Sequence, residues 1–192
     1  MPMPIGFLDD YKNTIFLETG FHRGDGIVEA LRAGFECIYS CDISVFAYGW
    51  CSHRFQDHHD IVHLLLQDSR EFLRDRIGHA DLNQGGKWIT DLGQASTFWL
   101  DAHWSGGNGE VGGIDGGSPA DHPLLEELAI IGTHPLRDHT LLIDDVREFG
   151  QEPGWPSLDE VKSAIWQINP AYDFRLADGA EHSEDILVAT VK

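Results

Sequence analysis

The chain has 192 residues, of which 42% are hydrophobic, enough for a covered sheet with one core in a single domain over residues 1–192. Its 32 acidic and 13 basic residues give a formal charge of −19, which disfavours nucleic acids and anionic membranes as partners. The sequence contains no run of about 18 apolar residues, and residues 1–6 show no basic segment followed by an apolar run, so we expect a cytoplasmic protein.

Apolar runs and amphipathic segments alternate along the chain. Five continuous apolar runs, typical of buried parallel strands, lie at 15–17, 37–41, 61–66, 97–100 and 140–143. The predicted helices lie between and after them, at 26–33, 44–54, 69–77, 122–131 and 157–168. The last two segments, 172–176 and 186–191, can pair as a hairpin. This alternation predicts an α/β fold with a doubly wound, mostly parallel sheet and helices on both faces.

Polar or acidic residues follow the five predicted strands of the alternating region. They are Glu18, Asp42, Asp68, Asp101 and the pair Asp144 and Asp145. Each of them alone is equally well explained as an ordinary strand-ending residue or helix cap. In a doubly wound sheet, however, the carboxyl ends of the strands share one edge, where ligands bind. We therefore expect these side chains to converge there.

The first turn, residues 18–26, follows a strand and opens a helix. Gly20 and Gly24 permit a tight turn and the close approach of a cofactor. The spacing differs from the dinucleotide-binding G-x-G-x-x-G pattern, and the acid at the strand end disfavours a diphosphate. An acid suits instead a cofactor with an ammonium group or hydroxyls. Asp42 is placed to accept hydrogen bonds from ribose hydroxyls, and Asp68 with Ser69 to meet a base.

These residues resemble the motifs of class I S-adenosylmethionine (SAM)-dependent methyltransferases, over the chain from residue 15 to its end. Glu18-x-Gly20-x-x-x-Gly24 is similar to the first motif, which surrounds the methionine part of the cofactor. Asp42 is similar to the ribose-binding acid and Asp68 to the acid beside adenine. The resemblance implies a Rossmann-like seven-stranded sheet of order 3-2-1-4-5-7-6. The cofactor-binding residues that it implies are Glu18, Gly20, Gly24, Asp42, Asp68, Ser69 and Asp101.

Three carboxylates are expected at neighbouring strand ends, from Asp101, Asp144 and Asp145. They repel one another unless they are protonated or bound to a cation, and carboxylate ligands suit Mg²⁺ and sometimes Ca²⁺ or Mn²⁺. The arrangement is similar to that of catechol-type and sugar O-methyltransferases, in which such acids hold a divalent ion. The alternative is that Asp101 and His103 are cofactor-edge or capping groups and that no metal binds.

His103 is the candidate general base, and Asp101 is the acid nearest to it in sequence. The catechol type has a lysine base three residues after the first acid, and this chain has Trp104 there. Histidine has an ordinary pKa near 6.5 and can take a proton at neutral pH. Alternatively, His103 is itself a ligand in a softer site for Zn²⁺ or Fe²⁺.

The sequence therefore favours SAM-dependent O-methyl transfer to a small molecule or sugar, with catalytic residues Asp101 and His103. Two alternatives stay open: a metal-dependent hydrolase that uses these two residues with Asp144 and Asp145, and a non-catalytic module that keeps the fold. The glycine-rich segment 106–117 is either a surface loop or a lid over the site. The acceptor is not identified, and a partner subunit in a homo-oligomer is one way to complete its pocket.

Overall fold

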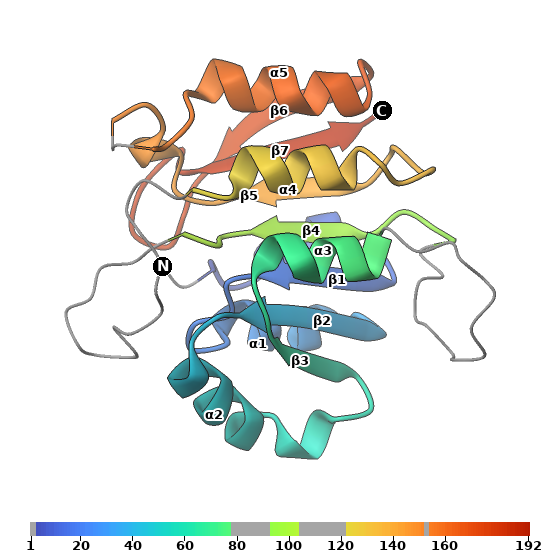
Figure 1. Cartoon of the computed structure of the whole chain (residues 1–192), viewed down its shortest axis with the longest axis vertical. Helices are drawn as coiled ribbons and strands as arrows, with labels where there is room; N and C mark the ends of the chain where they lie inside the picture. The colour runs from blue at the N-terminus through green and yellow to red at the C-terminus, as the bar shows by residue number, and fades with distance from the viewer. Residues whose placement is uncertain (1–2, 78–92, 104–121, 152–153) are drawn as a thin grey trace.

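The computed structural model describes residues 3–77, 93–103, 122–151 and 154–192. These residues contain a seven-stranded sheet in the order β3-β2-β1-β4-β5-β7-β6 (Figure 1). The strands are β1 (Ile15–Thr19), β2 (Cys37–Asp42), β3 (Val62–Leu66), β4 (Thr97–Leu100), β5 (Thr140–Ile143), β6 (Tyr172–Ala177) and β7 (Ile186–Val191). The predicted strand order is confirmed.

The helices also follow the predicted alternation. They are α1 (Asp25–Ala33), α2 (Val45–Arg54), α3 (Ser69–Ile77), α4 (Leu124–Ile131) and α5 (Leu158–Ile168). Ser44 caps α2 by accepting a hydrogen bond from the Ala47 N–H, and Ser157 with Glu160 forms the predicted capping box of α5. The helix expected over 122–131 begins at Leu124, after Pro123. The glycine-rich segment 106–117 and Trp104 lie outside the described residues.

The strands β1 to β5 pair in parallel, and the last hairpin reverses the direction. β7 runs antiparallel to both β5 and β6, and its pairing with β6 confirms the predicted hairpin. In the parallel part, Thr19 of β1 pairs with Cys41 of β2 and with Leu100 of β4. Leu100 in turn pairs with Ile143 of β5. The carboxyl ends of these strands therefore lie level along one edge, while β7 begins at that same edge.

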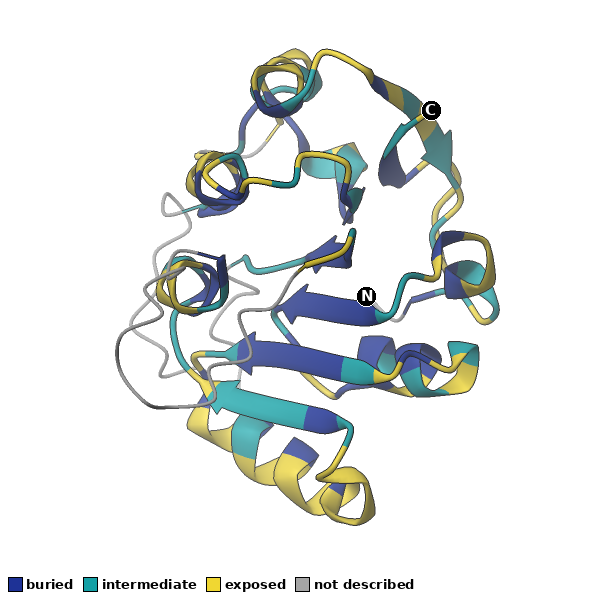
Figure 2. Ribbon diagram, turned by 90° about the vertical axis from the view of Figure 1, so that its right-hand side faces the viewer, coloured by how far each residue is buried: buried dark blue, intermediate teal, exposed yellow. Residues whose placement is uncertain are grey.

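Two helical layers cover the sheet, as Figures 1 and 2 show from two sides. α3, α4 and α5 cover one face, and α1, α2 and the short 3₁₀ helix η1 (Phe7–Tyr11) cover the other. Successive strand residues point to opposite faces, so Leu17 belongs to the first core and Phe16 to the second. In the described ranges, the structure contains no helix that is both long and apolar enough to span a membrane.

Candidate functional site

The turn after β1 is held close to the end of β4. Gly20 has φ of 84°, and a Cβ there would lie 2.6 Å from the carbonyl oxygen of Asp101. Gly24 has φ of 82°, and a Cβ there would lie 2.5 Å from the ring of Phe55. Both positions need the left-handed backbone that glycine takes without strain, and neither leaves room for a side chain. These two glycines bring the turn against the edge of the sheet.

Glu18 is buried beneath this turn and is only 2% exposed. Its Oε2 accepts a hydrogen bond of 2.5 Å from the Ser40 hydroxyl of the neighbouring strand. Its Oε1 lies so close to Gly26 that a Cβ there would be 1.9 Å away. Burial raises the pKa of Glu18 to about 8, and the Ser40 hydroxyl offsets part of the rise. The Glu18 side chain thus joins β1, β2 and the start of α1.

Asp42 connects the end of β2 to the same turn. Its Oδ2 accepts a hydrogen bond of 2.8 Å from the backbone N–H of His22, and its Oδ1 accepts one of 2.8 Å from the N–H of Ser44. His22 has φ of 43°, a left-handed conformation that costs energy in a residue with a side chain. The carboxylate of Asp42 therefore has a fixed orientation between the glycine turn and α2.

Asp68 and Ser69 lie after β3, at the start of α3. Arg70 donates to Asp68 from its backbone N–H, from Nε at 3.0 Å and from Nη2 at 2.8 Å. Hydrogen bonding and the charge of Arg70 lower the pKa of Asp68. Ser69 is 6% exposed. Asp68 thus holds Arg70 at the start of α3, and its expected place beside adenine stays a prediction.

His103 lies between two carboxylates. Its Nε2 is 2.7 Å from Oδ2 of Asp145 and 3.5 Å from Oδ1 of Asp101. Burial lowers the pKa of His103, but hydrogen bonds to Asp101 and Asp145 and their negative charges outweigh it and raise the pKa to about 10. In this arrangement His103 is a cation at neutral pH. It can act as the predicted base only after its contact with Asp145 is replaced.

A second acidic group surrounds Arg147, which follows β5 in the 3₁₀ helix η3 (Val146–Glu148). Its Nη1 contacts Oδ1 of Asp145 at 2.6 Å and also pairs with Asp185, the residue before β7. Asp144 is 5% exposed. Burial, together with the negative charges of Asp101 and Asp145, raises its pKa well above the usual range. A raised pKa favours the protonated form of Asp144, and His103 and Arg147 place positive charges beside Asp145. Both effects limit the repulsion among these acids, which the sequence analysis expected a metal ion to relieve.

Two groups of side chains among the described residues have ligand atoms within 4.8 Å of one another. One is Asp101, His103 and Asp145, and the other is Asp144, Asp145 and Asp185. The expected set of Asp101, Asp144 and Asp145 is thus divided between two groups that share Asp145. The first group has the mixed carboxylate and imidazole donors that Zn²⁺ or Fe²⁺ accept, and the second has the oxygen donors that suit Mg²⁺.

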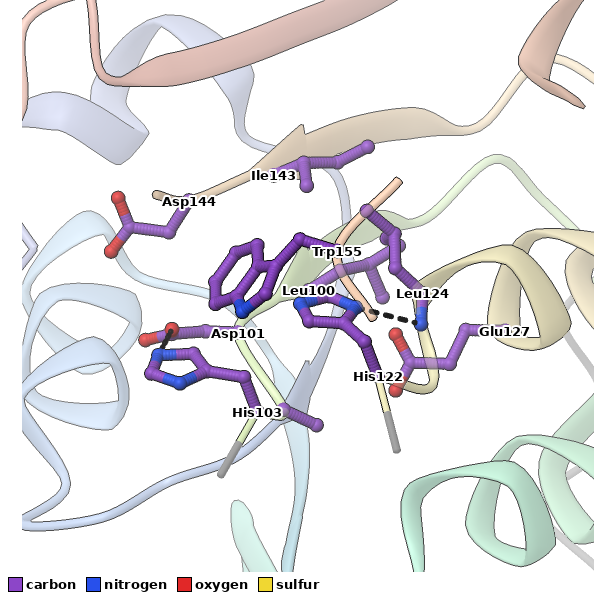
Figure 3. Close-up of a pocket in the computed structure, with 10 residues that line it drawn as sticks. Leu100, Asp101, His103, His122, Leu124, Glu127, Ile143, Asp144 and Trp155 are labelled. Carbon is purple, nitrogen blue, oxygen red and sulfur yellow. Dashed lines mark hydrogen bonds and ion pairs between the residues drawn. The ribbon is translucent and has the colours of Figure 1, made fainter. Parts of the chain in front are cut away.

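A pocket lies against the ends of β4 and β5 (Figure 3). Asp101, His103 and Asp144 line one part of it. Trp155 lies among them, with its ring 5.2 Å from the His103 ring and 4.0 Å from the His122 ring, measured between centroids. The remaining lining residues are Leu100, Ala102, His122, Leu124, Glu127 and Ile143. The pocket is therefore lined by acids, aromatic rings and apolar side chains.

Sequence reasoning missed three charged residues of this region. Asp185 precedes a strand instead of following one, yet β7 is antiparallel and so starts at the ligand edge. Arg147 gives no signal in the sequence beyond its closeness to Asp145. Glu127 has a signal, since it shares an inward helical stripe with Leu124, Leu128 and Ile131. Inward positions of a helix are usually apolar, so an acid at one of them indicates a functional site.

The comparisons with known proteins concern the fold. No protein-family model matches this sequence, and a comparison with curated proteins found no match. Among solved structures, an O-methyltransferase of Bacillus cereus in complex with S-adenosylhomocysteine (SAH) has a TM-score of 0.60 at 11% identity, covering 96% of this chain and 77% of that chain.

Two further structures agree with it. The O-methyltransferase TomG of Streptomyces achromogenes, in complex with SAM, has a TM-score of 0.56 at 12% identity, covering 96% of this chain and 76% of that one. A Streptococcus mutans protein assigned as a methyltransferase, in complex with SAH, has a TM-score of 0.53 at 15% identity, covering 97% and 94%. The chain thus has the fold of the class I SAM-dependent methyltransferases.

Proposed function

We propose that this protein transfers a methyl group from SAM to an oxygen of a small-molecule acceptor. The observation that carries the proposal is the position of Asp42. Its carboxylate is bonded to the glycine turn through the His22 N–H, so the turn and the acid form one rigid unit at the ligand edge. Structures with this fold hold SAM or SAH, and an acid after the second strand suits ribose hydroxyls.

The residues at this edge fit the chemistry of the cofactor. Asp42 offers carboxylate oxygens to the ribose hydroxyls. Gly20 and Gly24 let the backbone approach the methionine part, and Glu18 supports that turn from below. Asp68 and Ser69 are proposed beside adenine, and Asp101 beside the methionine part. When bound, SAM supplies a methyl group on a positively charged sulfur, and SAH leaves after the transfer.

The acceptor side is proposed at Asp101 and His103. Methyl transfer needs the acceptor oxygen in line with the methyl carbon, so holding the acceptor contributes much of the rate. As the new O–C bond forms, the hydroxyl proton has to leave. We assign this proton to His103. Once the acceptor hydroxyl has replaced Asp145 as its partner, the imidazolium can release its own proton to solvent, and the neutral imidazole then takes the hydroxyl proton.

A divalent cation is a further part of the proposal. Asp101 and Asp145 would hold it with His103 in the first ligand group, or Asp144 and Asp145 with Asp185 in the second. Such an ion lowers the pKa of a hydroxyl that binds it. It would meet competition from the positive charges of His103 and Arg147, which already contact Asp145 at 2.7 Å and 2.6 Å. The titrations with SAM and SAH are therefore made both with and without added Mg²⁺.

Isothermal titration with SAM and with SAH tests the cofactor assignment. We expect binding of both, and about tenfold weaker binding of both in Asp42→Asn, because the charge-assisted hydrogen bonds to the ribose are weakened. Asp57→Asn, which removes the same charge from an exposed position of the 3₁₀ helix η2 (Gln56–His58), is the matched control and should not change affinity. Absence of binding at millimolar SAM and SAH contradicts the proposed function.

A further inference from the structure

Glu127 of α4 is fully buried, at 0% exposure, and it lines the pocket. Neither of its carboxylate oxygens has a hydrogen-bond partner among the described residues. Glu29, another buried acid of this chain, differs: it is 5% exposed, and its Oε2 accepts hydrogen bonds from the Gly6 N–H at 2.9 Å and from Arg32 at 2.8 Å. A buried acid without partners is costly and calls for an explanation.

The surroundings of Glu127 contain a second polar group in the same condition. The Thr19 hydroxyl, at the end of β1, is buried and makes no hydrogen bond within the described part of the chain. Burial raises the pKa of Glu127 to about 7, and the Ser69 and Thr19 hydroxyls, which lie near its carboxyl group without forming a hydrogen bond to it, offset part of the rise. A carboxylate and a hydroxyl are thus held close together inside the protein, and both are able to accept hydrogen bonds.

The shape of the pocket limits what can reach these groups. Figure 3 shows the Glu127 carboxylate turned toward the other residues that line the pocket. The pocket offers about 10 Å³ of space, room for one group the size of a water molecule. Trp155 and His122 stand beside it as aromatic surfaces. Aromatic faces attract cations, and an ammonium group has about the required size and donates up to three hydrogen bonds.

We propose that Glu127 binds the ammonium group of the methyl acceptor, which places the acceptor among hydroxylated amines. The inference rests on the proposed function, which places the acceptor at Asp101 and His103, because these two residues line the same pocket as Glu127. A metal ion fits Glu127 less well, because Glu127 belongs to neither group of potential ligands found among the described residues. The hydroxyl of the acceptor would then extend toward Asp101, and its amine toward α4.

Two probes that differ in the ammonium group test this assignment. Tyramine and 4-ethylphenol share the phenol ring and differ in that group, and each is titrated into the protein saturated with SAH. We expect tyramine to bind at least about tenfold more tightly, because a buried carboxylate strongly favours a cation. Glu127→Gln should remove this difference. Equal affinity of both probes for the unchanged protein would overturn the proposal.

Glu126→Gln is the matched control, since it removes the same charge from the neighbouring residue of α4. The Glu126 side chain is 59% exposed and lies 3.6 Å from Arg70, so we expect the tyramine preference to survive within about twofold. Thermal unfolding of Glu127→Gln separates binding from folding. We expect an unchanged or raised Tm, because no hydrogen bond is lost. A lowered Tm, with the tyramine preference kept, would assign Glu127 a structural role and overturn the proposal.

Titration with SAH alone distinguishes failure of this inference from failure of the proposed function. If SAH binds and the tyramine preference is absent, the inference is wrong and the cofactor assignment stands. If SAH does not bind, tyramine titrated without it still tests Glu127 as an amine site. If Glu127→Gln weakens SAH binding about tenfold and leaves tyramine unchanged, Glu127 serves the adenine amine, and the proposal is overturned.

Discussion

Gly20 gives the sharpest prediction at the scale of a single residue. A Cβ at this position meets the backbone of Asp101, which belongs to a strand end and cannot move aside as a side chain can. The left-handed φ of 84° adds strain. We expect Gly20→Ala to lower the free energy of unfolding by about 2–4 kcal/mol and to weaken SAM binding. Urea denaturation of the variant and the unchanged protein measures the first effect.

Gly49 is the control for this substitution. It lies within α2, is exposed, and has no atom within 4 Å of the position where a Cβ would be. Because alanine favours a helix more than glycine does, Gly49→Ala should stabilise the protein by up to about 1 kcal/mol. A similar effect of the two substitutions would contradict the close contact between the glycine turn and β4.

The segment between α4 and β5 carries a prediction about pH. His139 is fully buried, and its Nδ1 accepts a hydrogen bond of 3.1 Å from the Ser96 N–H. Its Nε2 therefore carries the proton and donates to Nδ1 of His134 at 3.2 Å. Burial, with the neighbouring His134, lowers the pKa of His139 to about 4. A second proton would remove the acceptor on which Ser96 depends.

The sign of the effect follows from proton binding in the two states. Below an ordinary pKa near 6.5 the unfolded chain takes up a proton at this histidine and the folded protein does not, so acid favours unfolding. Above pH 6.5 this histidine is neutral in both states, so we expect it to cause no loss in the free energy of unfolding there. We expect about 3 kcal/mol to be lost as the pH falls to about 4. Urea denaturation at several pH values between 4 and 8 measures the loss.

His139→Asn is the informative variant, because its side-chain oxygen can replace Nδ1 as the acceptor and does not titrate. Its stability should depend less on pH over this range than that of the unchanged protein. His53→Asn, at an exposed position of α2, should leave the pH dependence as it was. An unchanged pH dependence in His139→Asn would show that this histidine is not the group that couples acid to unfolding.

The elements show why the sequence predicts the fold more fully than the site. Buried parallel strands are continuous apolar runs and capped helices have short-range signals, so both are visible locally. The site depends on pairings across the sheet. Asp185 meets Arg147 only because β7 is reversed, and Asp145 takes φ of 62° to reach both His103 and Arg147. No local pattern contains this information.

At the scale of the whole molecule, residues that are distant in sequence meet at one edge of the sheet, and their charges act on one another. The expectation that Asp42, Asp101 and Asp144 approach one edge follows from the handedness and order of a parallel sheet, which repeat across such folds. The charge state of each acid does not follow from topology. Burial and the like charges of its neighbours raise the pKa of Asp144. Burial also acts to raise the pKa of Asp145, but the nearby cations outweigh it and lower that pKa, so the three-dimensional structure is needed to distinguish these two neighbours.

The formal charge of −19 gives a prediction that involves the whole molecule. SAM carries one net positive charge, from its sulfonium and ammonium groups against its carboxylate, whereas SAH carries none. An acidic protein with carboxylates at the proposed site should attract SAM, and added salt should screen that attraction. Raising NaCl from about 20 mM to about 500 mM should weaken SAM binding about threefold and leave SAH binding within about 1.5-fold.

The comparison of the two ligands controls for other effects of salt, because SAM and SAH share every group except the methyl. Titration calorimetry at four salt concentrations gives both slopes on the same protein. Equal weakening of SAM and SAH would show that salt acts on the protein and not on the sulfonium charge. A SAM affinity independent of salt would place the sulfonium away from the acidic edge formed by Asp42, Asp101 and Asp144, and the proposed orientation of the cofactor would then be wrong.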